Sequence, residues 1–276
     1  MSKKLWINGV FALMAICALG AVTFAQGKLQ AQEKSLSCND NWNNGDRVGH
    51  CLIKEQMLAA TGSLTVDGKK NGGVSVKGWE RREVLVRAKI QSWADSKSEA
   101  EAIGNQIHIE TTGSNVSADG PSNNGEQSWS VSFEVFVPHN SNLSLKAHNG
   151  GISISSVRGQ IEFSTTNGGA TLKNLAGNVR GNTKNGGLTV VLEGNRWDGE
   201  GMDVVTTNGG VNLQVPENYS AHLEAGTVNG GMRYDIPITV QGEIKKELSL
   251  NLGSGGAPIK VRTTNGGVSI KQKSGI

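Results

Sequence analysis

Residues 165–191 read TTNGGATLKNLAGNVRGNTKNGGLTVV and contain the clearest repeat of the chain. It contains the tripeptide Asn-Gly-Gly twice, beginning at Asn167 and Asn185, and each copy is followed by apolar residues that alternate with small polar ones. Alternation with a period of two is typical of a β-strand with one buried face. The stretch therefore predicts strands joined by glycine-rich turns.

The same tripeptide recurs along the chain. Its seven copies begin at Asn71, Asn149, Asn167, Asn185, Asn208, Asn229 and Asn265. From Asn149 onward, successive copies are 18, 18, 23, 21 and 36 residues apart, and we interpret the last interval as two coils of 18. Four copies have a threonine two positions earlier, at Thr165, Thr183, Thr206 and Thr263. A repeat of this length is typical of solenoids.

Asn-Gly between strands also occurs in antiparallel hairpins, which are the alternative to a solenoid. Stacked coils are favoured because the third residue is always Gly and the alternating register returns with each repeat. Stacked Asn side chains could also hydrogen-bond in a ladder. The residues expected to face inward are Ile152, Ile154, Ala170, Leu172, Leu188, Val190, Val211 and Leu213. We predict an all-β fold, a parallel β-helix or β-solenoid with coils of 18–23 residues and Asn-Gly-Gly turns, over residues 61–276 and clearest over 149–276.

One short helix is expected in the N-terminal part of this domain. Residues 96–103 begin with Ser96 as a possible N-cap, Glu99 completes a capping box, and Gly104 ends the helix. The clearest single strand is 129–137, and the preceding residues 112–127 are predicted to be a polar loop.

The N-terminus has the layout of a secretory signal peptide. Lys3 and Lys4 precede a largely apolar stretch, and small residues lead to a cleavage site after Ala25. We predict a signal peptide over residues 1–25, with an uncleaved anchor as the alternative, and no transmembrane segment after its removal. The protein is therefore expected in the periplasm, the cell envelope or outside the cell.

Residues 26–60 are polar and mixed, and we interpret them as a leader that contains Cys38 and Cys51. An isolated cysteine pair in an exported protein most simply forms a disulfide. Because His50 adjoins Cys51, a metal site is the alternative, although two thiolates and one histidine make a poor zinc motif.

Charge and composition limit the partners. The chain carries 27 Lys+Arg and 24 Asp+Glu, and removing residues 1–25 takes away Lys3 and Lys4, which leaves a net charge of +1. A balance this even does not attract nucleic acid, so none is expected as a partner. The 38 Gly against 5 Pro indicate many tight turns between short strands.

Motifs that carry chemistry are scarce. No histidines have metal-binding spacing, and no nucleophile elbow or phosphate-binding glycine loop is present. The one local acidic cluster of the repeat region is Asp198, Glu200 and Asp203, which could be solvated loop charges or the carboxylates of a carbohydrate-active enzyme. We predict no catalytic residue, no metal site and no cofactor.

Two tryptophans are candidates for ligand contact. Trp42 lies in the predicted disulfide loop, and Trp197 lies beside the acidic cluster. An exposed indole could stack on a sugar ring, or either side chain could instead pack down on the solenoid as a cover.

The chain resembles the bacterial putative-adhesin family, whose domain has no known function. The resemblance rests on the strand-turn-strand at residues 72–79, the short helix at 96–103, the strand end Val137-Pro138 and the Thr-x-Asn-Gly-Gly repeats. It covers residues 64–272 and implies a right-handed parallel β-helix or a similar solenoid. The family name implies adhesion but assigns no site residues, and Cys38 and Cys51 lie outside the match.

Two functional hypotheses follow. The first is an exported, non-catalytic envelope or surface protein that acts as an adhesin or scaffold and binds an unidentified surface ligand, a glycan or a protein, through a repetitive solenoid face. The alternative is a carbohydrate-active enzyme, a polysaccharide lyase or hydrolase on a β-helix. The sequence favours the first because no catalytic groups converge.

Overall fold

The computed structural model describes residues 36–39, 47–122, 128–236 and 246–273. Over these ranges the chain is mostly β-structure with one helix, α1 (Lys97–Asn105). The strands are β1 (Val48–Ala59), β2 (Ser63–Asp67), β3 (Val74–Trp79), β4 (Glu83–Ala94), β5 (His108–Thr112), β6 (Asn115–Asp119), β7 (Ser128–Pro138), β8 (Asn142–Ala147), β9 (Ile152–Ser155), β10 (Arg158–Asn167), β11 (Ala170–Lys173), β12 (Ala176–Asn185), β13 (Leu188–Val191), β14 (Gly201–Asn208), β15 (Val211–Pro216), β16 (Ala221–Asn229), β17 (Met232–Asp235), β18 (Glu247–Leu252), β19 (Pro258–Asn265) and β20 (Val268–Lys273).

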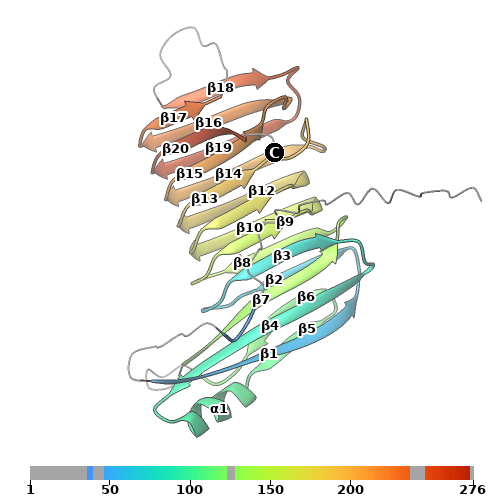
Figure 1. Ribbon diagram of the computed structural model, residues 1–276, viewed down its shortest axis with the longest axis vertical. Coiled ribbons are helices and arrows are strands. Elements are labelled where there is room, and N and C mark those ends of the chain that lie inside the picture. Colours follow the sequence, from blue (N-terminus) through green and yellow to red (C-terminus); the bar gives the residue numbers. More distant parts are fainter. Residues whose placement is uncertain (1–35, 40–46, 123–127, 237–245, 274–276) are drawn as a thin grey trace, which may run out of the picture. The chain divides into compact units, whose positions relative to one another are not determined.

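Within the described ranges these strands form two ten-stranded sheets. Sheet 1 has the order β1-β4-β7-β3-β9-β11-β13-β15-β20-β17, and sheet 2 has the order β18-β16-β19-β14-β12-β10-β8-β2-β6-β5. Neighbouring strands are parallel from β7 to β17 in sheet 1 and from β16 to β6 in sheet 2. Figure 1 shows the coils stacked on one another, each giving one strand to each sheet. The architecture is therefore solenoid-like.

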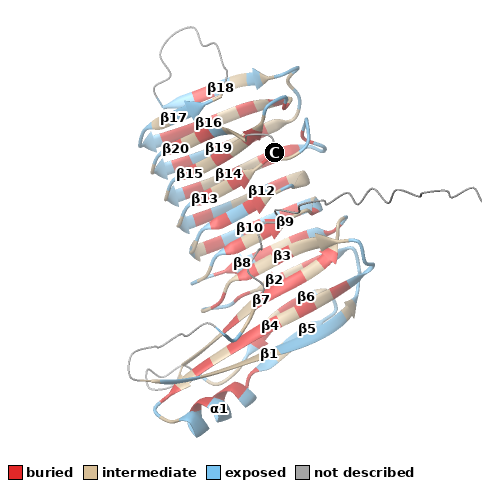
Figure 2. Ribbon diagram, viewed as in Figure 1, coloured by how far each residue is buried: buried red, intermediate tan, exposed pale blue. Residues whose placement is uncertain are grey.

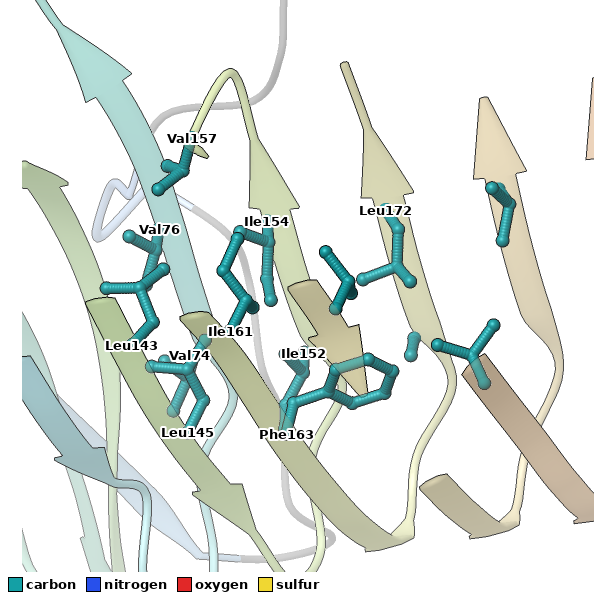
Figure 3. Packing of buried hydrophobic residues seen from close by; sticks show 14 of the residues in the cluster. Val74, Val76, Leu143, Leu145, Ile152, Ile154, Val157, Ile161, Phe163 and Leu172 are labelled. Carbon is teal, nitrogen blue, oxygen red and sulfur yellow. The ribbon is translucent and has the colours of Figure 1, made fainter. Parts of the chain in front are cut away.

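The core lies between the two sheets and follows the alternation of the sequence. The predicted inward residues form two register columns, and each residue is at most 2% exposed: Ile152, Ala170, Leu188 and Val211, then Ile154, Leu172, Val190 and Leu213. This prediction is confirmed. In Figure 3, Leu143 and Leu145 of β8 point toward the valines and isoleucines of β3 and β9. Figure 2 shows the buried and exposed positions alternating along the strands. Burial of each large aliphatic side chain stabilises the folded state by about 1.5–3 kcal/mol.

The predicted solenoid does not account for the stretch between β3 and β8. Here β4 runs antiparallel to β7, and β5 runs antiparallel to β6. The prediction of a loop over residues 112–127 is wrong for 115–119, which form β6. The helix is confirmed with both halves of its capping box, since the Glu99 amide donates to Ser96 Oγ and the Ser96 amide donates to Glu99 Oε2. It ends at Asn105, one residue beyond the predicted stop at Gly104.

The prediction of a leader over residues 26–60 is also wrong for 48–59. These residues form β1, which pairs antiparallel with β4 along its whole length, from Val48 opposite Ala94 to Ala59 opposite Glu83. None of its side chains is fully buried, because β1 is the edge strand of sheet 1. A strand with so little buried surface shows no clear apolar alternation, and this explains why the sequence pattern missed it.

The last coil in the sequence is not the last coil in the stack. Strand β19 lies between β14 and β16, and β20 lies between β15 and β17, so residues 258–273 insert between two earlier coils. The interpretation of the 36-residue interval as two successive coils is therefore wrong. The intervening strand β18 runs antiparallel to β16 at the edge of sheet 2. Coils with equivalent turns and inward residues can stack in more than one order, so spacing along the chain does not determine their neighbours.

Candidate functional site

The seven repeat asparagines form one continuous column at the same corner of the stacked coils. Six of the seven side-chain amide nitrogens donate to the carboxamide oxygen of the asparagine on the neighbouring coil, with donor–acceptor distances of 2.7–3.0 Å, and Asn71 at the end of the column accepts. In spatial order the column is Asn71, Asn149, Asn167, Asn185, Asn208, Asn265 and Asn229. These amides bond to one another, so the column holds the coils in register.

A second column of buried threonines supports the same corner. Each Thr Oγ1 donates to the carbonyl oxygen of the first glycine in the tripeptide of the neighbouring coil, at 2.6–2.8 Å. The members are Thr165, Thr183, Thr206, Thr263 and Thr227, each at most 5% exposed. Thr227 has the same spacing to Asn229 as the others to their asparagines, but it was not among the four recognised in the sequence.

The first glycine of the tripeptide lets these corners approach closely. A Cβ atom placed on Gly168 would lie 2.2 Å from the carbonyl oxygen of Gly150 on the neighbouring coil. Any side chain there would push the coils apart, because this contact is with backbone that cannot move independently. The corner is therefore closed to large side chains.

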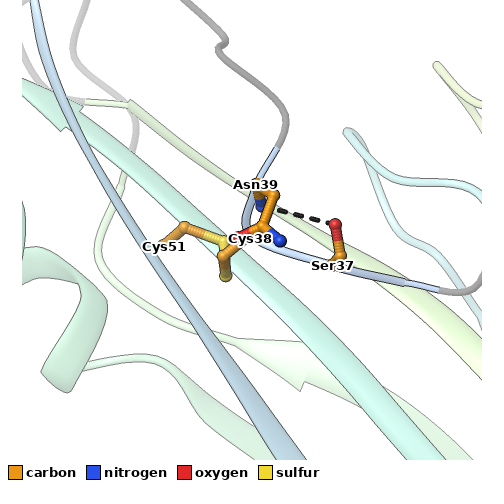
Figure 4. Close-up of a disulfide and its surroundings, with 4 residues drawn as sticks. All are labelled: Ser37, Cys38, Asn39 and Cys51. Carbon is orange, nitrogen blue, oxygen red and sulfur yellow. Dashed lines mark hydrogen bonds between the residues drawn. A yellow bond between two sulfur atoms is a disulfide. The ribbon is translucent and has the colours of Figure 1, made fainter.

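Cys38 and Cys51 are joined by a disulfide, with their Cα atoms 5.7 Å apart (Figure 4). Cys51 lies on β1, so the bond fastens the segment before this strand to the edge of sheet 1. Sulfur atoms bonded in this way cannot act as thiolate ligands. In the part of the chain that the structure describes, no group of three or more His, Cys, Asp or Glu side chains is arranged to hold a metal ion.

The two tryptophans proposed for ligand contact have different outcomes. Trp42 lies outside the described residues, as does the predicted signal peptide. Trp197 is 5% exposed and its indole Nε1 donates to the carbonyl oxygen of Gly177 at 2.9 Å. The interpretation of Trp197 as a sugar-stacking residue is corrected, because its ring packs against the core as a cover.

The three carboxylates near residue 200 have separate partners. Asp198 pairs with Arg158 at 2.6 Å, and Asp203 pairs with Arg262 at 2.6 Å. Glu200 accepts a hydrogen bond from the Asn178 side-chain amide at 2.6 Å. The partners of the three acids lie on three different strands, β10, β12 and β19, so each acid has a separate local structural role.

The outer face of sheet 2 has a charge pattern that the sequence analysis missed. One register row crosses five neighbouring strands with alternating acids and bases: Glu162, Arg180, Asp203, Lys260 and Glu224. Every member lies five positions before a repeat asparagine, so aligning the repeats would have revealed the row. We call it the charged row. At the β19–β16 end of the charged row, two members form an ion pair, with Lys260 Nζ 3.0 Å from Glu224 Oε1.

Beside the charged row lies a shallow hollow of about 430 Å³. Its floor includes Ser164, Asn182 and Val205, which are register neighbours on β10, β12 and β14, and the Ser164 hydroxyl donates to Asn182 Oδ1 at 3.2 Å. Lys146 on β8 and Arg262 on β19 continue the same row at its two ends. We call this space the sheet 2 hollow.

A buried carboxylate was also missed, on the outer face of sheet 1. Glu134 on β7 is 2% exposed and forms ion pairs with Arg87 of β4 and with Lys77 of β3, the latter at 3.2 Å. The hydrogen bond from Arg87 to Glu55 is the main cause that raises the pKa of the Arg87 guanidinium, and Glu134 raises it further. Buried charges persist when they are paired in this way, so the cluster ties β1, β4, β7 and β3 together.

Among the described residues, no helix is both long and apolar enough to cross a lipid bilayer.

A comparison with protein families finds that the model described as Toastrack DUF4097 matches residues 61–271. No curated protein matches the chain. Among solved structures, a putative cell adhesion protein from Clostridium sporogenes is 14% identical, with a TM-score of 0.45 over 81% of this chain and 100% of that one. A putative adhesin from Bacteroides fragilis is 10% identical, with a TM-score of 0.36 over 81% of this chain and 97% of that one. A putative adhesin from Parabacteroides merdae is 8% identical, with a TM-score of 0.32 over 81% and 96%.

Proposed function

The chain belongs to the Toastrack DUF4097 family, a putative-adhesin family of unknown function, and from this we propose that it is an exported, non-catalytic surface or envelope protein that binds through an outer face of its stacked coils. The observation that carries the proposal is the regularity of these faces. Side chains on neighbouring coils stand in register rows across β8, β10, β12, β14, β19 and β16. Repeat proteins generally use such extended surfaces for binding.

The proposal gives the Asn-Gly-Gly tripeptides a structural role. Coils of 18–23 residues turn at Asn71, Asn149, Asn167, Asn185, Asn208, Asn229 and Asn265, and these residues hold the register of the face. Support comes from their amide column and from the threonine column beside it. A rigid frame lowers the entropy cost of presenting many weak contacts at once.

Export is part of the proposal. A signal peptide at residues 1–25 and a disulfide between Cys38 and Cys51 fit an oxidising compartment, the periplasm, the envelope or the outside. Cell fractionation and mass spectrometry of the intact chain test this. We expect a processed chain that begins at Gln26 with no free thiol, and an unprocessed chain in the cytoplasm would contradict export.

Face-specific variants test the binding role. In one variant, Ser164→Glu and Asn182→Glu add bulk and negative charge to the outer face of sheet 2, and in its matched control, Thr171→Glu and Thr189→Glu do the same on sheet 1. We measure attachment of the producing cells to surfaces, with purified full chain as competitor. One variant should lose attachment while the other keeps it. If cells attach equally well with either variant and without the protein, the proposal is overturned.

The enzyme alternative is tested on the same purified chain. Incubation with a panel of polysaccharides, followed by measurement of released sugar ends, should show no turnover. Turnover that disappears in Glu200→Gln would replace the binding role by a carbohydrate-active one.

A further inference from the structure

We infer that the sheet 2 hollow is a binding site for a linear anionic polysaccharide whose carboxylates stand on alternate sugars. This inference rests on the proposed function and names the class of ligand for one of the two faces. Four features of the hollow carry it: its uncompensated cations, their spacing, the chemistry of its floor and its position on a sheet face.

The first feature is charge. The hollow is lined by the cations Lys146, Arg180 and Arg262 and by the acids Glu162 and Asp203. Arg262 and Asp203 neutralise each other at 2.6 Å. Lys146, Arg180 and Glu162 are exposed, and none of them makes an ion pair or a side-chain hydrogen bond with another described residue. Two cations against one acid leave the hollow with an excess of positive charge.

The second feature is the spacing of the cations along the stack. The two uncompensated cations lie two strands apart, with Lys146 on β8 and Arg180 on β12. Neighbouring strands are about 4.8 Å apart, so these two cations stand about 10 Å apart along the stack. A polysaccharide with a carboxylate on alternate sugars repeats its charge on this scale. Guanidinium groups bind carboxylates through paired, charge-assisted hydrogen bonds.

The third feature is the floor. Ser144, Ser164 and Asn182 offer hydroxyl and carboxamide groups that can both donate and accept hydrogen bonds, and this suits sugar hydroxyls. The aromatic ring that lines the hollow, Phe163, is 3% exposed and serves the core. Binding therefore depends on charge and hydrogen bonds, and we expect it to weaken as salt is added.

The fourth feature excludes the commonest way of binding a peptide. Proteins built of sheets bind extended peptides at an open strand edge, where unpaired backbone groups are available. In the hollow, β10 and β12 are paired on both sides, so their backbone groups bond to neighbouring strands. Only side chains remain for recognition, which favours a ligand rich in hydroxyl and carboxylate groups.

Titration calorimetry of the full mature chain tests the inference with three probes: hyaluronan fragments with a carboxylate on alternate sugars, polygalacturonate with one on every sugar, and neutral dextran. We expect hyaluronan to bind at least as well as polygalacturonate, and dextran not to bind. Tighter binding of polygalacturonate would indicate a response to charge density alone and would overturn the spacing argument.

Charge variants locate the site. The double variant Lys146→Gln, Arg180→Gln should weaken hyaluronan binding by roughly tenfold or more, because two charge-assisted contacts are lost. Its matched control is Lys173→Gln, Lys271→Gln, which removes the same charge from the outer face of sheet 1 on other coils of the same stack. Equal weakening in both variants, or none in the first, would overturn the assignment.

Different results would overturn the polysaccharide site and the proposed function. A wild-type chain that supports surface attachment but binds neither anionic probe would overturn the polysaccharide site and leave the proposed function intact. A chain that neither supports attachment nor binds a probe would overturn both.

Discussion

The phenyl ring of Phe163 fills the space that a side chain on Gly181 would need. The two residues are register partners on β10 and β12, and a Cβ atom on Gly181 would lie 2.2 Å from the ring of Phe163. Both positions face the core, so a large residue on one coil is matched by the absence of a side chain on the next. Packing between coils is therefore complementary at this point, even though the repeats look interchangeable.

This relationship predicts a coupled pair of variants. Gly181→Ala should destabilise the chain by about 1–3 kcal/mol, because the rigid ring and the neighbouring strands must shift. Phe163→Leu should partly relieve the clash, so the double variant should be more stable than the sum of the single effects. Urea denaturation followed by circular dichroism measures all three variants. Strict additivity would show that the ring does not oppose the added methyl group.

The asparagine column predicts a difference between inner and terminal members. Asn185 donates to Asn167 and accepts from Asn208, whereas the Asn229 side chain makes one hydrogen bond to another described residue, Asn265. Each hydrogen bond contributes about 0.5–1.5 kcal/mol, so Asn185→Ala should cost roughly twice as much as Asn229→Ala. Denaturation midpoints of the two variants provide the comparison. Equal costs would contradict the prediction that the loss of stability scales with the number of hydrogen bonds in the column.

The inserted coil predicts an unexpectedly large effect near the C-terminus. Ile270 is 0% exposed because β20 has neighbours on both sides, β15 and β17. Ile270→Ala should therefore cost about 2–5 kcal/mol, as much as Ile154→Ala from the middle of the stack. If the coils stacked in sequence order, Ile270 would lie in a terminal coil and its truncation would cost much less. Equilibrium unfolding of both variants distinguishes the two arrangements.

The disulfide predicts a loss of stability on its removal. Cys38 and Cys51 are 13 positions apart, and closing a loop of this size contributes about 3 kcal/mol by restricting the unfolded chain. The variant Cys38→Ser, Cys51→Ser should lose about this much, and the wild-type chain should match it after reduction. If the reduced wild-type chain kept the full stability of the oxidised one, the bond would have no role in holding β1.

Burial of Tyr219 predicts a loss of stability at alkaline pH. Its side chain is 3% exposed, and burial raises the pKa of the phenol above the ordinary value of 10.0. The folded state therefore holds the phenol proton more tightly than the unfolded state. The contribution of Tyr219 to the free energy of unfolding is fully present below pH 10 and decreases as the pH rises further. The wild-type chain should lose about 1.4 kcal/mol more than Tyr219→Phe between pH 8 and pH 11. Urea titrations at pH 8 and pH 11 give the difference, and parallel losses would contradict it.

The pattern of buried and exposed residues within each coil could be predicted from the sequence. Alternation identified the inward residues from Ile152 to Leu213, the repeated tripeptide placed one asparagine per coil, and Ser96 with Glu99 located the helix start. These features are local, because a strand face or a helix cap depends on residues a few positions apart. The charged row could also have been found, since its members share one position in every repeat.

The order in which the coils stack could not be predicted from the sequence. Equivalent coils offer equivalent surfaces, so nothing in the repeat pattern places residues 258–273 between two earlier coils. The edge strand β1 escaped notice because it buries too little surface to show a pattern. Likewise, the sheet 2 hollow brings Lys146 next to residues far along the chain, and the burial of Trp197 depends on packing against the carbonyl of Gly177. Each of these features depends on contacts between residues distant in sequence, and local alternation carries no information about them.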